Sequence, residues 1–288
     1  MPALRSYSSE IMRILRILVG SLLIIGCRDD KSQIGGVRTD IEEASDSSFA
    51  SQDRGPKERS SVDEEKAFSY LHEVLLNKEF GAGSGSVIRW IESPDVVLVE
   101  GSEKSRAVLN RVIEQLNNAL EGTPMRLESV TDSKRDRRIE VFMVPGSRFR
   151  AIGRTRGFKV YGKQDGYVWV FWDTRKKFIQ RATVMVAVDR IDGDLLEHVL
   201  LEELTQSLGP LGDTTILPES VMFQRGSDHG RAPKLSDWDC RMLKLLYGHL
   251  KPGDEEAEVR EAYRQFWRTG LNAKPAKEKS SNTREERP

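Results

Sequence analysis

The stretch EHVLLEELTQSLGPLGD, residues 197–213, has the periodicity of a helix followed by a turn. At about 100° per residue, one arc of this helix collects its polar side chains. These are His198, Glu202, Glu203 and Gln206. The opposite arc consists of Leu200, Leu201, Leu204 and Leu208. Leu195 and Val199 interrupt the polar side, so we expect the helix to be buried over most of its circumference. A polar stripe on such a helix must face a cleft, water or hydrogen-bond partners.

The rest of the central sequence has the pattern of one α/β domain. Amphipathic spacing predicts helices before and after the quoted stretch. They cover residues 61–78, 102–120, 236–250 and 254–270. Short apolar and β-branched runs, bounded by Gly, Pro and Asp, predict strands. They cover residues 86–91, 95–100, 125–130, 138–144, 157–162, 166–172 and 182–188.

Residues 1–27 have the layout of a bacterial lipoprotein signal, in which a short basic segment precedes about ten apolar residues. The final IIGC resembles a lipobox, whose cysteine, here Cys27, is lipidated and becomes the mature N-terminus. Several acyl chains on one residue anchor a protein stably. An uncleaved anchor helix is the alternative, and either Met1 or Met12 is the start. In both cases we expect a protein of the bacterial cell envelope, facing the periplasm or the exterior, with the membrane as its partner through Cys27.

The sequence on both sides of the domain is polar and lacks apolar periodicity, which is typical of disordered segments. We therefore expect a signal at 1–27, a tether at 28–61, the main domain at 62–252, a C-terminal helix at 253–272 and a disordered tail at 273–288.

The chain of 288 residues has a formal net charge of zero, from 45 basic and 45 acidic residues, so no long-range field favours a nucleic-acid partner. The local basic clusters SKRDRR and TRKK lie beside acids or a turn, as solvated loops do. Cys27 and Cys240 lie in such different surroundings that an internal disulfide is not expected. On its amphipathic helix, Cys240 is expected to be a buried free thiol.

From Glu202 onward, the quoted stretch resembles the zinc-binding pattern HExxHxxGxxHD of the metzincin peptidases. Glu203 falls at the general-base glutamate of that pattern. Gly209 falls at the glycine that turns the chain out of the helix, and Asp213 falls at the acid after the last ligand.

Two segments downstream extend the resemblance. ESVMFQ places Met222 at the position of the methionine turn, and LSDWDCRMLKLLYG is similar to the C-terminal helix of matrix-metalloprotease-type domains. The resemblance covers about residues 61–252. It implies a zincin-like α/β (α+β) fold with a mixed sheet, an active-site-type helix and C-terminal helices.

All three histidines of the metzincin pattern are replaced, by Glu202, Gln206 and Gly212. Catalytic zinc sites generally supply three imidazole, thiolate or carboxylate ligands, whereas an amide is a weak ligand and glycine has no side chain. Without a metal to acidify water, Glu203 alone cannot hydrolyse a peptide efficiently. We expect a degenerate zinc site with no bound metal or other cofactor.

The EExxQ helix followed by Leu-Gly and Asp, together with the lipoprotein signal and Arg89-Trp90, also resembles a family of uncharacterised bacterial lipoproteins with a domain of unknown function. In that family this arrangement is the usual one. The resemblance implies no activity.

Three roles remain open for the polar stripe. His198 and Glu202, with Glu203 or Asp213 and with His229, can form a non-standard site for a divalent metal in a metal-dependent hydrolase. Alternatively, Glu203 and Asp213 can act as acid and base in metal-free hydrolysis, for example of a glycan.

The third role is structural. Glu202, Glu203 and Gln206 can bond to an edge strand, expected at 182–188, and to the turn that contains Met222, which is then a core residue. The function expected from these residues is a non-catalytic module that binds a peptide or protein in a cleft along that edge strand.

Overall fold

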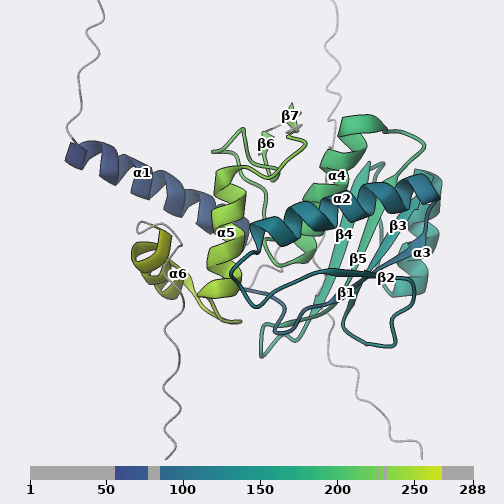
Figure 1. Cartoon of the computed structure of the whole chain (residues 1–288), viewed down its shortest axis with the longest axis horizontal. Coiled ribbons are helices and arrows are strands. Elements are labelled where there is room, and N and C mark those ends of the chain that lie inside the picture. Colours follow the sequence, from purple (N-terminus) through teal and green to yellow (C-terminus); the bar gives the residue numbers. More distant parts are fainter. Residues whose placement is uncertain (1–55, 77–84, 226–227, 230–231, 268–288) are drawn as a thin grey trace, which may run out of the picture.

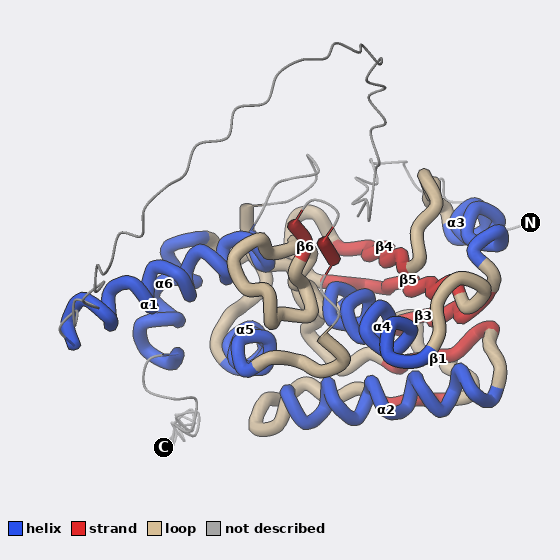
Figure 2. The backbone as a smooth tube through the Cα atoms, turned by 90° about the horizontal axis from the view of Figure 1, so that it is seen from above, coloured by secondary structure: helices blue, strands red, loops and turns tan. Residues whose placement is uncertain are grey.

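The computed structural model describes residues 56–76, 85–225, 228–229 and 232–267. Within these residues five strands form one sheet, and helices pack on both of its faces (Figure 1, Figure 2). In chain order the strands are β1 (Asp95–Glu100), β2 (Glu128–Val130), β3 (Arg138–Val144), β4 (Gly166–Trp172) and β5 (Ile179–Ala187). The predicted α/β (α+β) class with a mixed sheet is confirmed.

The strand order is β2-β1-β3-β5-β4. The first four strands in this order pair in parallel, and β4 pairs antiparallel to β5. The prediction that residues 182–188 form the edge strand is therefore wrong, because β5 returns between β4 and β3 and leaves β4 outermost. Both β4 and β5 are apolar runs, so their sequences carry no signal for which of them lies at the edge.

Apart from α3, the helices follow the predicted order. They are α1 (Pro56–Leu71) with the π-helical turn η1 (His72–Leu76), α2 (Glu103–Ala119), the 3₁₀ turn η2 (Gly146–Arg148), α3 (Phe149–Arg156), α4 (Gly193–Ser207), α5 (Asp237–Gly248), and α6 (Glu256–Ala262) with the π-helical turn η3 (Tyr263–Trp267). A separate short hairpin consists of β6 (Gln224–Arg225) and β7 (Asp228–His229). None of the helices in the described residues combines the length and apolar composition that crossing a membrane requires.

Alternation along β3 shows which helices cover each face of the sheet. Ile139 and Val141 point into the larger core, which α2 and α4 complete. Phe142 and Val144 point to the other face, where they pack with Phe149 of α3. Figure 1 and Figure 2 both place α1, α5 and α6 together at one end of the molecule, away from α3.

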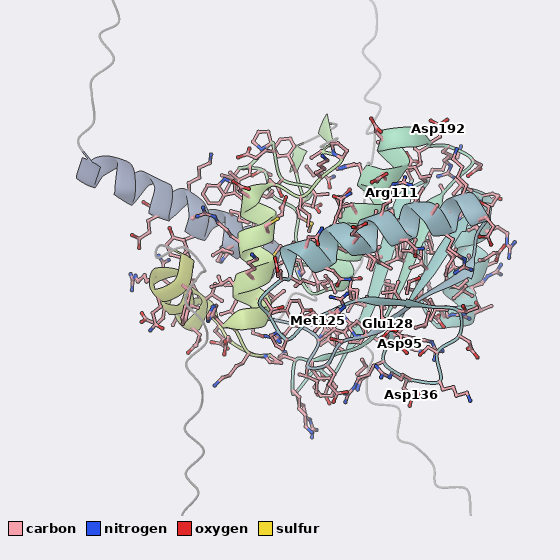
Figure 3. All side chains as sticks on the ribbon, in the orientation of Figure 1. Asp95, Arg111, Met125, Glu128, Asp136 and Asp192 are labelled. Carbon is pink, nitrogen blue, oxygen red and sulfur yellow. The ribbon has the colours of Figure 1, made fainter. Side chains whose placement is uncertain are left out.

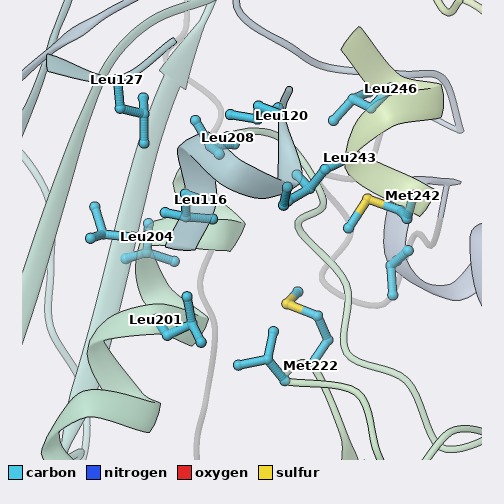
Figure 4. Close-up of a cluster of buried hydrophobic side chains, with 14 of the residues drawn as sticks. Leu116, Leu120, Leu127, Leu201, Leu204, Leu208, Met222, Met242, Leu243 and Leu246 are labelled. Carbon is cyan, nitrogen blue, oxygen red and sulfur yellow. The ribbon is translucent and has the colours of Figure 1, made fainter. Parts of the chain in front are cut away.

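The larger core joins the sheet to this helical end. Figure 4 shows side chains from three helices meeting there, among them Leu116 of α2, Leu204 of α4 and Leu243 of α5. Met222 lies in the same cluster and is fully buried.

Two predicted strands are wrong, and one helix was missed. Residues 86–91 make only an isolated parallel bridge, between Arg89 and Phe178. Residues 157–162 form a loop, while α3 forms from a sequence with few apolar residues. In α3, Gly153 allows the following loop to pack closely, since a Cβ at this position would lie 2.9 Å from a Val160 methyl carbon.

The side chain of Arg89 explains why its segment leaves the strand conformation. Its guanidinium donates to the carbonyls of Leu246 and Leu250 at 2.6 and 2.5 Å, and it lies over the ring of Tyr247. These carbonyls lie at the C-terminal end of α5, where helical partners run out. Arg89 therefore caps α5, and its burial lowers the pKa of the guanidinium.

A fully buried carboxylate, that of Asp239, ties together α1, α5 and the loop before α5. It accepts from the hydroxyls of Tyr70 and Ser220 at 2.8 and 2.6 Å, and from the backbone N–H of Val221 at 3.1 Å. It also accepts from the backbone N–H and hydroxyl of Ser236, which completes the N-terminal capping box of α5. Burial of the Tyr70 hydroxyl raises its pKa well above the ordinary value, and the charge of Asp239 raises this pKa further.

We predict that Asp239→Asn lowers the free energy of unfolding by about 3 to 4 kcal/mol, because an amide N–H₂ would then face donors inside the core. The matched control is Asp237→Asn in the same helical turn, where the exposed side chain contributes only about 0.5 kcal/mol through the helix dipole. Urea unfolding of the full chain measures both. Equal stability of the two variants would contradict this role for Asp239.

Candidate functional site

The helix α4 holds the polar stripe inside the protein. It packs across β4 and β5, and α2 lies alongside it. The exposed fractions are 2% for His198, 8% for Glu202, 1% for Glu203 and 0% for Gln206. The stripe is thus enclosed by protein on all sides.

Hydrogen bonds connect the stripe to the segments that follow α4. The amide of Gln206 donates to the carboxylate of Asp213 at 3.0 Å. A ring nitrogen of His198, Nδ1, lies 2.9 Å from the carbonyl of Ala232, and the other, Nε2, lies 3.7 Å from a carboxyl oxygen of Glu202. The structure therefore brings His198, Glu202, Gln206 and Asp213 into one cluster.

Glu203 points from α4 onto β4. A Cβ added to Gly166 would lie 2.3 Å from Glu203 Oε1 and 2.6 Å from a methyl carbon of Val199, so only glycine leaves room for this side chain. Among the described residues, no partner hydrogen-bonds to Glu203 Oε2 or to Gln206 Oε1, although both atoms are buried. Two buried acceptors thus lie in the stripe without a donor.

Both glutamates of the stripe are held toward their neutral form. Burial raises the pKa of Glu202 well above its ordinary value, and the nearby charge of Asp213 raises it further. Burial also raises the pKa of Glu203 well above its ordinary value, with smaller contributions from Glu202 and Asp213. A neutral carboxyl is the form that a low-dielectric interior tolerates.

The chain leaves α4 through a turn that requires glycine. Gly209 has φ +126°, and a Cβ there would lie 2.1 Å from the carbonyl oxygen of Ile88. The last carbonyls of α4 are satisfied from outside the helix. Trp90 Nε1 donates to Ser207 O at 2.9 Å, and the Tyr247 hydroxyl donates to Leu208 O.

The residues present do not fit a metzincin-type zinc. At the three ligand positions, Gln206 uses its amide to bind Asp213, Glu202 lies against His198, and Gly212 offers only its backbone, whose N–H donates to Val74. Within the residues that the structure describes, no three His, Cys, Asp or Glu side chains are grouped as metal ligands would be. The side chain of His229 and all of Cys27 lie outside the described residues, so their predicted roles stay predictions.

Sequence reasoning missed two groups at the site. Gly166 was assigned only to a strand, although a glycine at the start of the apolar run GYVWVFW is a signal of close approach by another group. The carbonyl of Ala232 has no signal in the sequence, because a backbone acceptor is available at every residue.

The family model described as "Protein of unknown function (DUF2927)" matches residues 64–265, which is most of the chain. The chain belongs to this family. The EExxQ stripe, the Gly209 turn, Met222 and α5 all lie inside the matched part of this DUF2927 protein. Among solved structures, that of myroilysin is similar to the DUF2927 chain with a TM-score of 0.33 and 11% sequence identity, covering 56% of this chain and 98% of that one. No curated protein matches the sequence.

The raised pKa of Glu203 predicts how stability of the DUF2927 protein varies with pH. Between the ordinary glutamate pKa, about 4.3, and the higher pKa in the folded state, the folded chain keeps a proton that the unfolded chain has released. Stability therefore falls as pH rises through this window. Glu203→Gln removes that loss and should add more than about 1 kcal/mol to the free energy of unfolding at pH 8, with a smaller gain at pH 5.

Glu197→Gln is the matched control, because it makes the same change on α4 at a carboxylate that is paired with Arg111 at 2.8 Å. It should give a small loss at pH 8, with no gain in stability as the pH rises. Urea unfolding at several pH values measures both variants. A Glu203→Gln variant whose stability follows the same pH curve as the parent protein would show that Glu203 is charged in the fold.

Proposed function

We propose that this protein is an exported, lipid-anchored protein of the bacterial cell envelope, and that its DUF2927 domain is a non-catalytic module that binds an extended peptide or protein segment along the outer edge of β4. The observation that carries the proposal is the hydrogen bond from Gln206 to Asp213. In the metzincin pattern, Gln206 stands at a zinc-ligand position and Asp213 at the acid after the last ligand. In this chain the two side chains bind each other instead.

The raised pKa values of the two glutamates support a role without catalysis. A general base must be deprotonated in the resting enzyme near the working pH. Burial instead favours the protonated forms of Glu202 and Glu203. Glu203 also lies against Gly166, enclosed between α4 and β4.

The outer edge of β4 supports the choice of ligand. In an antiparallel pair, residues alternate between bonding the partner strand and pointing away from it. The amide of Ala187 donates to the carbonyl of Asp165 at 2.8 Å, which sets this alternation. Gly166, Val168 and Val170 of β4 therefore turn their backbone N–H and C=O groups outward.

The direction of these groups fits β-strand addition, in which main-chain hydrogen bonds to a sheet edge supply the affinity. Val168 and Val170 are each only 2% exposed, so the bound segment must displace the chain that covers this edge. Within the described residues no strand pairs with this edge, since β4 ends the strand order. A peptide along β4 would pass Gly166 and hence the carboxyl of Glu203. Glu203 Oε2 is one of the buried acceptors without a donor among the described residues.

Amide exchange tests this mode directly. Peptides selected on the purified full chain from a random decapeptide display library should bind saturably. On binding, exchange at Gly166, Val168 and Val170 should slow by about tenfold or more, whereas Tyr167 and Trp169, already bonded to β5, should not change. NMR-detected hydrogen exchange measures this pattern. The amides of β2, at the opposite edge, serve as the internal control.

Failure to select any saturable peptide, or protection confined to segments away from β4, would refute peptide binding at this edge. The competing function is a metal-dependent hydrolase that uses His198, Glu202 and Glu203, and the approach of His198 to Glu202 is the observation in its favour. Metal analysis of the same preparation, with zinc, manganese and calcium titrations, separates the two. Stoichiometric tight metal that is lost in Glu202→Ala would establish the hydrolase site instead.

The lipid anchor is tested separately, because it rests on the sequence IIGC alone. Expression in a bacterium with a labelled fatty acid should place the label on the full chain. Cys27→Ser should abolish it, since the thiol is the acylation site. A Cys27→Ser protein that still carries the label would refute lipidation at this residue.

A further inference from the structure

The sheet face that α3 covers is apolar at one end and charged at the other. Phe142, Met185 and Tyr167 form an apolar row across β3, β5 and β4. The next row on this face, two residues earlier along β3 and β5, pairs Glu140 with Thr183. The polarity of this face therefore changes within a few residues.

Arginines occupy the next row toward the start of β3. Ile139 pairs with Ala182, and Arg138 and Arg181 each come one residue earlier on these parallel strands, so they are neighbours on the same face. Like charges on adjacent strands destabilise a sheet unless something compensates them. A third arginine, Arg156, approaches this row from the last residue of α3.

A cavity of about 250 Å³ opens at this point, lined by the three arginines together with Glu140, Phe171 and Thr183. Asp136 stands at its rim, on a loop beyond one end of the sheet (Figure 3). The cavity lies on the opposite face of the sheet from Glu203, and at the opposite end of β4 from Gly166.

One carboxylate holds two of the arginines in place. Glu140, whose side chain is 13% exposed, accepts from Nε of Arg138 at 3.1 Å and from Nε of Arg156 at 2.5 Å. Arg138 also donates one terminal nitrogen to the carbonyl of Arg135. Within the described residues nothing accepts from the terminal nitrogens of Arg156, which leaves them available at the cavity.

Arg181 is oriented without any carboxylate. Its guanidinium lies 3.9 Å from the ring centroid of Phe171, the residue opposite it on β4, and it forms no ion pair with a described residue. The cavity lining thus carries three positive charges against two negative ones, of which Asp136 is exposed. A stacked guanidinium keeps its fork of N–H donors free for an oxyanion.

We propose that this cavity, defined by Arg138, Arg156 and Arg181, is a binding site for a phosphate monoester. Three guanidinium groups line one small volume, and a phosphate group offers three terminal oxygens to their remaining N–H donors, whereas a carboxylate offers two. The cavity is larger than a phosphate ion alone requires, and the ring of Phe171 supplies an apolar wall for the organic part of the ester. The ester is either a soluble metabolite or the headgroup of a phosphatidic-acid-type lipid.

Calorimetric titration of the full chain at low ionic strength tests the site, with inorganic phosphate and glycerol 3-phosphate as the probes. We expect saturable binding with one site per chain. Arg181→Gln should weaken the Kd by about tenfold or more, because it removes the unpaired fork. Arg150→Gln is the matched control, since it removes the same charge from an exposed position on α3 and should change the Kd by less than about twofold.

Vesicles of phosphatidylcholine with and without phosphatidic acid distinguish the two sources of phosphate. Binding to the acidic vesicles that glycerol 3-phosphate displaces supports the site and assigns a lipid headgroup. Phosphate binding without vesicle binding supports it and assigns a soluble ester. Absence of saturable binding by either phosphate probe would overturn the proposal, as would equal weakening by Arg150→Gln and Arg181→Gln.

Discussion

Burial of α4 from His198 to Ser207 is the constraint on which the architecture depends. The helix carries leucines that each contribute about 1.5 to 3 kcal/mol when buried, which offsets the cost of enclosing carboxyl groups beside them. Because this part of the helix has no exposed face, other elements must cover each of its sides. The strands β4 and β5 cover one side and α2 covers another. Burial raises the pKa of both glutamates, and Gly166 supplies the space that Glu203 occupies.

Two buried charged residues, Asp239 and Arg89, hold α1 and α5 in place beside α4. Asp239 gathers donors from α1, from the segment around Ser220 and from its own helix cap, while Arg89 closes the opposite end of α5. Among the described residues, each charge is satisfied by hydrogen bonds and not by an ion pair. Removing one partner from such a network leaves the others unsatisfied, so these contacts act together. Tyr247 links the two halves, since it stacks with Arg89 and donates to Leu208 at the end of α4.

The sequence predicted those features that depend on local periodicity. The helices α2, α4 and α5 and most strands follow from amphipathic or alternating patterns, and the buried polar stripe follows from the angles between His198, Glu202 and Gln206. The positions of β4 and β5 in the sheet could not be predicted from the sequence. Both strands are uniformly apolar, and the pairing of strands that are distant in the chain leaves no local signal. The helix α3 was missed because tertiary packing of Phe149 and Ile152, more than propensity, stabilises so short a segment. The role of Arg89 was also hidden, since its acceptors are backbone carbonyls far along the chain.

The zero net charge conceals a separation of charge across the sheet. Glutamates are enclosed on the α4 face, and arginines surround an open cavity on the α3 face. Both regions contact β4, one at Gly166 and the other at Phe171, so this strand is the shortest physical connection between them. Parallel stacking of Phe158 on Trp169, with centroids 4.7 Å apart, and pairing with β5 along its length hold the strand in one position. A strand that is held by this stacking and by pairing with β5 transmits little displacement from one site to the other. Substitutions at well-separated sites that share no partners generally have additive effects on free energy. The two sites should therefore bind their ligands independently.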